Sequence, residues 1–352
     1  MPTSILLNKY KETIKKTVKW TEENWAAIVN EADIQGHYKA LYFALSVGDM
    51  EKAARFREII RKRFLRSDGD FRMEENCKGF KLFPCLPPNR YIYPNGWIVV
   101  GLQRMGLYGF AKQGLDFMLR FQDDLTGGFF HSFDPVKKEV DKSSVCCSCS
   151  SSAGLACLAC GRIENAQRAG DFLLRLLELQ PEPKKYFFSC MNPDGTLHTD
   201  VFRNENQWDP KGRKQKCLSA VDDGLNELTW LTGKPSKFLA RLYATTGEKK
   251  YLDGAIRAFD FFHCLDKNAW KNYASCKTMW AGTELYRLTG EQRFLDTALR
   301  IADFFCESQT EEGAWVHTLW YKDEKEQPLS MTMDITFEFG SEISDLVFDI
   351  AK

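Results

Sequence analysis

The sequence predicts an all-α protein, an (α/α)6 toroid in which an inner ring of six parallel helices is enclosed by six antiparallel outer helices. A repeat carries this prediction. Residues 246–262 (TGEKKYLDGAIRAFDFF) and 289–305 (TGEQRFLDTALRIADFF) recur at an offset of 43 residues, and fainter copies follow Gly48, Gly106 and Gly161. Apolar residues recur at helical spacing in each copy, which indicates stacked helix pairs rather than strands.

Glycine divides the helix pairs. In every copy a helix ends at glycine, whose tolerance of positive φ suits a helix C-cap, and a charged amphipathic helix follows. The outer helices carry most of the charge, whereas the inner ones are richer in Gly, Ala, Ser and Cys, as expected for helices enclosed by neighbours. Outer helices are expected at about 4–31, 49–65, 107–123, 162–180, 248–264 and 291–309. Inner helices are expected at about 37–47, 95–105, 145–160, 235–246, 274–289 and 331–350.

Long connections enter the inner helices and tight glycine turns leave them. The long ones, 66–94, 124–144, 181–216 and 310–330, contain Gly, Pro and Asp turn signals between short β-like runs. We therefore expect short β-hairpins at one end of the ring. A cavity mouth should lie at that end, among the N-termini of the inner helices, and residues 1–352 should form one domain without a break.

Composition excludes several classes of function. The 48 Lys and Arg residues balance the 48 Asp and Glu residues, so no net charge favours nucleic acid. No run of about 18 apolar residues predicts a membrane span, and the apolar run near the first residue is too short for a signal peptide. The twelve cysteines lack the pattern of a small secreted domain, so we expect a cytoplasmic protein with reduced thiols.

Five of those cysteines fall within residues 142–162, KSSVCCSCSSSAGLACLACGR. A structural zinc ion needs four ligands around one point. Cys149 and Cys157 are eight residues apart, which is about 12 Å along a helix. We therefore expect no metal here and interpret most of these cysteines as small packing residues, with Cys149 near the cavity mouth.

The repeated helix pairs, the turn LYRLTGEQRFLDTALRIADFF and the segment GGFFHSFDPVKKEVD before an inner helix resemble the six-hairpin glycosidase-like (α/α)6 toroids. The GGFFHSFD hairpin resembles that of N-acylglucosamine 2-epimerase-type members. The resemblance extends from about residue 37 onward and implies the toroid fold. It leaves the chemistry open, because the superfamily includes glycosidases, sugar epimerases and unsaturated-uronyl hydrolases. The epimerases' central Arg, Glu and His set has no match here, so no catalytic residue is carried over.

Candidate site residues are those near the N-termini of inner helices. Asp222 and Asp223 form the sharpest polar cluster, because adjacent carboxylates can take different pKa values and act as acid and base. They can equally be a helix N-cap. The other catalytic candidates are His131, His317 and Glu338. The expected substrate-binding residues are Tyr91, Tyr93, Trp97, Cys149, Trp230, Lys277, Trp280 and Asp334. Core packing is the alternative for the tryptophans, a structural ion pair for Glu338 and a capping or solvated charge for Lys277.

Three functions follow from this set. Its richness in aromatic and sulfur-containing residues favours a hydrophobic small-molecule substrate, isomerised or cyclised in a biosynthetic pathway of specialised metabolism. The second is a carbohydrate-active hydrolase, lyase or epimerase. The third is a ligand-binding toroid without catalysis. The nucleotide-binding and metalloprotease motifs are lacking, so we expect an enzyme that needs no cofactor.

Overall fold

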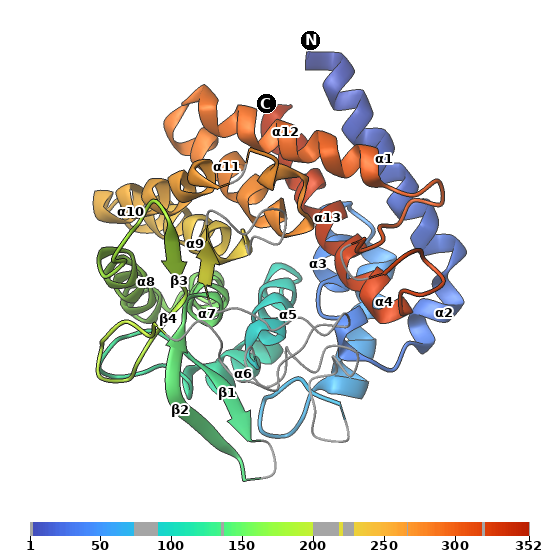
Figure 1. Ribbon diagram of the computed structural model, residues 1–352. Helices are drawn as coiled ribbons and strands as arrows, with labels where there is room; N and C mark the ends of the chain where they lie inside the picture. The colour runs from blue at the N-terminus through green and yellow to red at the C-terminus, as the bar shows by residue number, and fades with distance from the viewer. Residues whose placement is uncertain are drawn as a thin grey trace.

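A computed structural model describes residues 3–73, 91–134, 137–199, 218–220, 229–265, 267–318 and 321–351. In this part of the chain the helices alternate between an inner and an outer set, as expected (Figure 1). The inner set is α3 (Ala40–Ser46), α5 (Tyr93–Arg104), α7 (Cys147–Ala159), α9 (Trp230–Thr246), α11 (Cys276–Thr289) and α13 (Leu329–Ile350). The outer set is α1 (Thr3–Glu23), α2 (Trp25–Asn30), α4 (Met50–Ile59), α6 (Tyr108–Leu119), α8 (Ile163–Glu178), α10 (Lys249–Asp260) and α12 (Gln292–Ser308).

The inner helices close into a ring. Each packs against the next, α3 on α5, α5 on α7, α7 on α9, α9 on α11 and α11 on α13, and α13 returns to contact α3. The outer helices α1, α4, α6, α8, α10 and α12 each pack on an inner helix, and α2 packs on α1, so the outer helices form the rim in Figure 1. The all-α toroid predicted from the repeat is thereby confirmed.

The expected helix bounds need correction at several places. The outer helix expected at 4–31 is two helices, α1 and α2, and the helix expected at 49–65 ends in a π-helical turn, Ile60–Phe64. The inner helix expected to begin at Pro235 begins at Trp230, so the proline lies inside α9. A proline cannot donate a bond to the carbonyl four residues before it. That carbonyl, of Leu231, instead accepts a bond from the Cys147 thiol at 3.5 Å.

Short strands occupy the loops at one end of the ring. Strands β1 (Phe130–Asp134) and β2 (Glu139–Cys146) form an antiparallel hairpin, and β4 (Cys190–Met191) adds to the other edge of β2. Strand β3 (Tyr186–Phe188) pairs with β5 (Leu218–Ala220). Strand β2 leads directly into α7, so the expected inner helix 145–160 begins two residues later than predicted. These hairpins confirm the β-structure expected in the long loops.

The glycine turns lie at the opposite end of the ring. Gly247 ends α9 and Gly290 ends α11, with φ of 73° and 72°, and each backbone N–H bonds to the carbonyl four residues earlier. Residues other than glycine rarely adopt this left-handed conformation. The inner helices therefore run in one direction, with their C-termini at the end of the tight turns.

Small residues allow the inner helices to approach closely. A Cβ atom added to Gly154 of α7 would lie 2.2 Å from the ring of Phe238 in α9, and one added to Gly96 of α5 would lie 2.0 Å from Ser152 of α7. Cys149 and Cys157 of α7 are fully buried. The cysteine-rich segment thus packs as a narrow helix between α5 and α9.

Gly233→Ala should destabilise the ring. A Cβ atom at this position of α9 would lie 2.6 Å from two backbone atoms of α11, those of Lys277 and Thr278. Backbone cannot rotate away as a side chain can, so the helices must separate, and overpacking of this kind costs about 1–3 kcal/mol. Chemical denaturation of this variant and of Gly109→Ala measures the change in the free energy of unfolding. Gly109 is exposed with no atom near its added Cβ, so its variant should keep or gain stability.

Among the described helices none is long and apolar enough to cross a membrane. We propose that the whole chain is a single folding unit, because the ring closes only when the first and last inner helices meet. Limited proteolysis that released two stable halves would contradict this.

Candidate functional site

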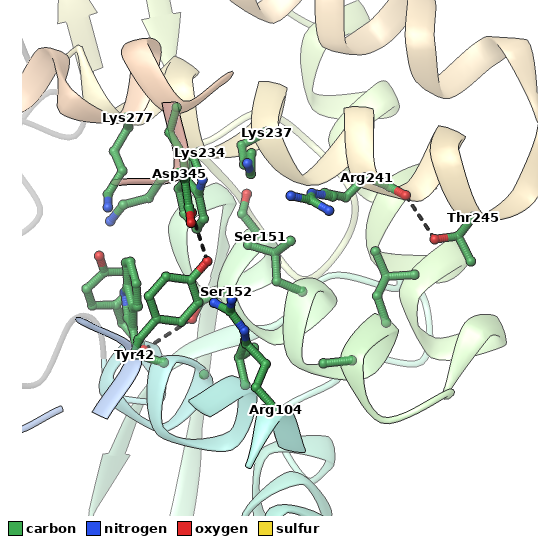
Figure 2. A pocket seen from close by; sticks show the side chains of 18 of the residues that line it. Tyr42, Arg104, Ser151, Ser152, Lys234, Lys237, Arg241, Thr245, Lys277 and Asp345 are labelled. Atoms are coloured by element: carbon green, nitrogen blue, oxygen red, sulfur yellow. Dashed lines mark hydrogen bonds between the residues drawn. The ribbon is translucent and has the colours of Figure 1, made fainter. Parts of the chain in front are cut away.

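A cavity of about 540 Å³ runs along the axis of the inner ring, a volume typical of small-molecule sites. All six inner helices contribute to its wall (Figure 2). The described residues that line it are Tyr42, Tyr93, Gly96, Trp97, Val100, Arg104, Ser151, Ser152, Leu155, Leu158, Ala159, Lys234, Lys237, Arg241, Thr245, Lys277, Trp280, Arg287, Asp345, Phe348 and Asp349.

Helix α9 presents a row of cations to this cavity. The cations Lys234, Lys237 and Arg241 line it, and Thr245 follows them on the same helix. Their spacing of three or four residues places them on one face, over about 16 Å of the axis. In Figure 2 the side chains of Lys237 and Arg241 point from α9 into the space that Arg104 of α5 faces from the other side.

The environment of Lys237 lowers its pKa. It is buried, its Nζ lies 3.4 Å from a Glu284 carboxylate oxygen, and it stands 4.1 Å from the ring centre of Trp280. Burial and the neighbouring Arg241 cation lower its pKa to about 8, although Glu284 partly offsets them. An amine with this pKa is neutral in part near neutral pH and can accept a proton.

Helix α13 carries a stripe of buried carboxylates beside the cavity. Asp334, Glu338 and Glu342 recur every four residues and so share one face. Lys39 pairs with Asp334 and, at 2.5 Å, with Glu338, while Lys277 pairs with Glu338 and, at 2.8 Å, with Glu342. Burial opposes the charge on Lys39, but Asp334 together with Tyr38 and Tyr93 outweighs it, and the pKa of Lys39 is raised well above its ordinary value.

Lys277 connects this cluster to the cavity. Its ammonium lies 4.7 Å from the ring centre of Trp97 and 5.3 Å from that of Trp280. The two indoles stack at 5.6 Å. Tyr93 lines the same region, and burial raises its pKa to about 12, so its phenol stays protonated. This part of the site therefore combines aromatic faces with one fixed cation.

Cys276 lies at the edge of the carboxylate cluster. Its sulfur and one oxygen each of Glu338 and Glu342 lie within 4.8 Å of one another, a grouping that could hold a metal ion. The Lys277 ammonium contacts both glutamates, however, and burial together with Glu342 raises the pKa of the Cys276 thiol to about 12. The arrangement favours an ion-pair cluster over a cation site.

The sequence-predicted residues fall into three groups. Tyr93, Trp97, Lys277 and Trp280 line the cavity, and Asp334 and Glu338 belong to the cluster that holds Lys277. Five others are described but lie outside the cavity wall: Tyr91, Cys149, Trp230, His131 and His317. The third group, Asp222 and Asp223, lies outside the described residues, and the roles predicted for both remain predictions.

The residues outside the wall have other partners. His131 is buried in the β1–β2 hairpin, with its ring nitrogens 2.5 Å from Ser144 and 3.0 Å from Ser132. Tyr91 donates to Asp70 at 2.6 Å. His317 packs its ring at right angles against Tyr273. Each of these contacts orders the loop end of the toroid.

Sequence reasoning missed most of the cavity's cations. Lys234, Lys237, Arg241, Arg104 and Arg287 were not candidates, although all line the wall. The signal was present in KPSKFLARLYATT, where cations recur at positions three and four apart within a helix expected to be enclosed. A charge repeated on one face of an inner helix must point to a polar cavity or a buried partner.

We expect no stoichiometric zinc on the Cys146–Cys160 segment. Cys146 precedes α7, Cys149 and Cys157 are separated by two helical turns, and Cys160 lies beside Gln103 at 3.8 Å. Metal analysis of the purified protein measures this. Zinc that is lost when Cys146 and Cys149 are both changed to Ser would contradict the expectation.

No family model and no curated protein sequence matches the chain, but solved structures do. A D-mannose isomerase is similar with a TM-score of 0.65 at 13% identity, over 95% of this chain and 96% of that one. A family 76 α-mannanase from Bacteroides thetaiotaomicron gives 0.64 at 14% identity, over 95% of both chains. Cellobiose 2-epimerase from Bacillus thermoamylovorans gives 0.56 at 12% identity, over 88% and 87%. These likenesses define the class of fold, the six-hairpin toroid.

Proposed function

We propose that the protein is a carbohydrate-active enzyme that isomerises or epimerises a sugar by proton transfer in the axial cavity. The observation that carries the proposal is the pair of lysines against Trp280: Lys237, whose pKa is lowered to about 8, and Lys277, which is held between Glu338 and Glu342. The fold shared with a mannose isomerase and a cellobiose epimerase supports the same chemistry.

The reaction would use the two lysines differently. Neutral Lys237 removes the proton from the carbon next to the sugar's carbonyl and becomes an ammonium ion, while the C–H electrons form a double bond and the carbonyl oxygen becomes negative. The Lys277 ammonium stabilises that oxygen. Return of a proton to the opposite face of the same carbon gives an epimer. Return to the former carbonyl carbon, while the adjacent hydroxyl gives its proton to the negative oxygen and becomes the new carbonyl, gives an isomer.

The character of the wall favours a sugar over the hydrophobic substrate expected first. Six cations line the cavity, Arg104, Lys234, Lys237, Arg241, Lys277 and Arg287, together with Asp345 and Asp349. A hydrophobic ligand would strip water from these groups without replacing its hydrogen bonds, which costs free energy. Hydroxyl groups can replace them, and the aromatic faces of Trp97 and Trp280 suit the apolar face of a pyranose.

A glycoside hydrolase is the second candidate. An α-1,6-mannanase from a Salegentibacter species, inactivated at two adjacent aspartates and solved with α-1,6-mannotetrose, has a similar fold, with a TM-score of 0.60 at 13% identity over 95% of this chain and 99% of that one. This chain also carries an adjacent pair, Asp222 and Asp223, in a segment outside the described residues. That pair is what favours the hydrolase.

Product analysis separates the two candidates. The purified protein is incubated with mannose, mannose 6-phosphate, mannuronate, cellobiose and α-1,6-mannotetrose, and the products are resolved by chromatography. The proposal expects at least one sugar to give a product of unchanged mass and altered retention. Shortening of mannotetrose without any isomer or epimer would instead establish the hydrolase.

A further inference from the structure

Three arginines line the cavity at the end of the ring where the tight turns lie. Arg104 comes from α5, Arg241 from α9 and Arg287 from α11, and all three line the same space. Each is exposed and lies in the last turns of its helix. Lys237 lies one turn further in along α9. Within the proposed reaction scheme these arginines have no role.

Three carboxylates lie near the three arginines and Lys237, one fewer than these four cations. Buried Glu284 pairs with Lys237, with Arg241 at 2.9 Å and with Arg287, so one carboxylate serves three cations. Asp345 accepts a bond from the Tyr42 hydroxyl at 3.0 Å, and Asp349 adds a third negative charge.

Arg104 differs from Arg241 and Arg287 in its partners. In the part of the chain that the structure describes, no carboxylate lies within ion-pair distance of it. Its guanidinium instead lies 4.6 Å from the ring centre of Tyr42, at the cavity wall.

Interaction with the carbonyl groups at the helix C-termini does not by itself explain where the three guanidinium groups lie. Cations at helix C-termini are favourable because terminal carbonyls carry partial negative charge. Among the described residues, however, none of the three guanidinium groups donates a hydrogen bond to a backbone carbonyl; Arg241 and Arg287 turn to Glu284 and Arg104 to Tyr42. Their side chains face the cavity rather than the ends of their own helices.

We propose that Arg104, Arg241 and Arg287 form an oxyanion subsite, and that the substrate is an acidic sugar whose carboxylate or phosphate binds there. Guanidinium groups bind both oxyanions through paired hydrogen bonds. Arg241 follows Lys237 by four residues, which is about 6 Å along the axis. A single sugar can therefore place its carbonyl end at Lys237 and its acidic end at the arginines. The sugar part of this inference rests on the proposed function; the oxyanion part does not.

Calorimetric binding tests the subsite without requiring turnover. The full-length protein is titrated with mannose, mannuronate, mannose 6-phosphate and inorganic phosphate, and Arg104→Gln and Arg287→Gln are compared with Arg168→Gln on the outer helix α8. Arg104→Gln is the decisive variant, because Arg104 makes no ion pair whose loss would disturb the fold. We expect an acidic sugar to bind at least tenfold more tightly than mannose, and Arg104→Gln to remove most of that difference while Arg168→Gln leaves it intact.

Each outcome of these titrations either supports or overturns the oxyanion subsite. Preference for mannose 6-phosphate identifies a phosphate ligand, preference for mannuronate a carboxylate, and tight binding of both a general oxyanion subsite. Mannose binding as tightly as the acidic sugars, or acidic sugars bound equally by wild type and Arg104→Gln, overturns the subsite. If acidic sugars or phosphate bind through Arg104 but no sugar is ever isomerised or epimerised, the proposed function fails and the subsite stands.

Discussion

Lys237→Met is expected to lower turnover by about 10²–10⁴-fold, the usual contribution of a positioned acid or base. Methionine keeps the length of the side chain and removes the amine. Stability should be retained at pH 7, because the pKa of Lys237 in the folded protein lies below the 10.5 of an unperturbed lysine and its charged form is therefore disfavoured by folding. Glu284 still keeps Arg241 and Arg287 as partners in the variant.

The pH dependence of wild-type activity is a second test of Lys237 as the base. Lys237 accepts a proton only when neutral, so activity of the wild type should rise as pH increases through its pKa of about 8. The matched control is Lys249→Met on the exposed face of α10, where the lysine pairs only with Asp253 among the described residues. Equal turnover by Lys237→Met and the control, or activity that falls across that pH range, would remove Lys237 as the base.

Glu338→Leu should cause the largest loss of stability. Glu338 is buried and is shared by Lys39 and Lys277, so its removal leaves two buried ammonium groups with only Asp334 and Glu342 as partners. Each ammonium then keeps one carboxylate but loses its contact with Glu338, and the loss of a buried hydrogen bond to a charged group costs about 1.5–3 kcal/mol.

Urea denaturation measures the free energy of unfolding of this variant against the wild type. Glu312→Gln, at an exposed position after α12, is the control and should change it by less than about 0.5 kcal/mol. A comparably small change for Glu338→Leu would mean that solvent reaches the cluster and that its ion pairs contribute little to the fold.

The toroid was accessible from the sequence because its signals are local. Two patterns indicate the helix pairs: the repeat of residues 246–262 at 289–305, and the glycine at each turn. Both can be recognised from consecutive residues alone, without knowing which helices pack together. The bounds of α9 were not readable in this way. By local rules Pro235 marks the first turn of a helix. Helix α9 nevertheless begins five residues earlier, and the Leu231 carbonyl that Pro235 cannot bond accepts a bond from the Cys147 thiol, 88 residues before the proline in the chain.

The site was accessible only in part. Trp97, Trp280 and Lys277 were found because they lie near the start of inner helices. Lys237 and Arg241 were missed because a charged residue in a helix is ordinarily assigned to solvent, and which face of an inner helix turns to the axis depends on how the whole ring packs. His131, a plausible catalytic residue by type, lies in β1 with its ring nitrogens against Ser144 and Ser132 instead of in the cavity wall.

Hydrogen exchange at the substrate carbon tests the central claim most directly. The protein is incubated in D2O with whichever sugar the product screen identifies, or with mannose 6-phosphate and mannuronate in turn, and deuterium at the carbon next to the carbonyl is followed by NMR. Proton transfer by Lys237 predicts deuterium incorporation with the wild type and Lys249→Met, and at least a hundredfold slower incorporation with Lys237→Met. Isomer or epimer formed without any deuterium, or incorporation unchanged in Lys237→Met, would contradict the mechanism.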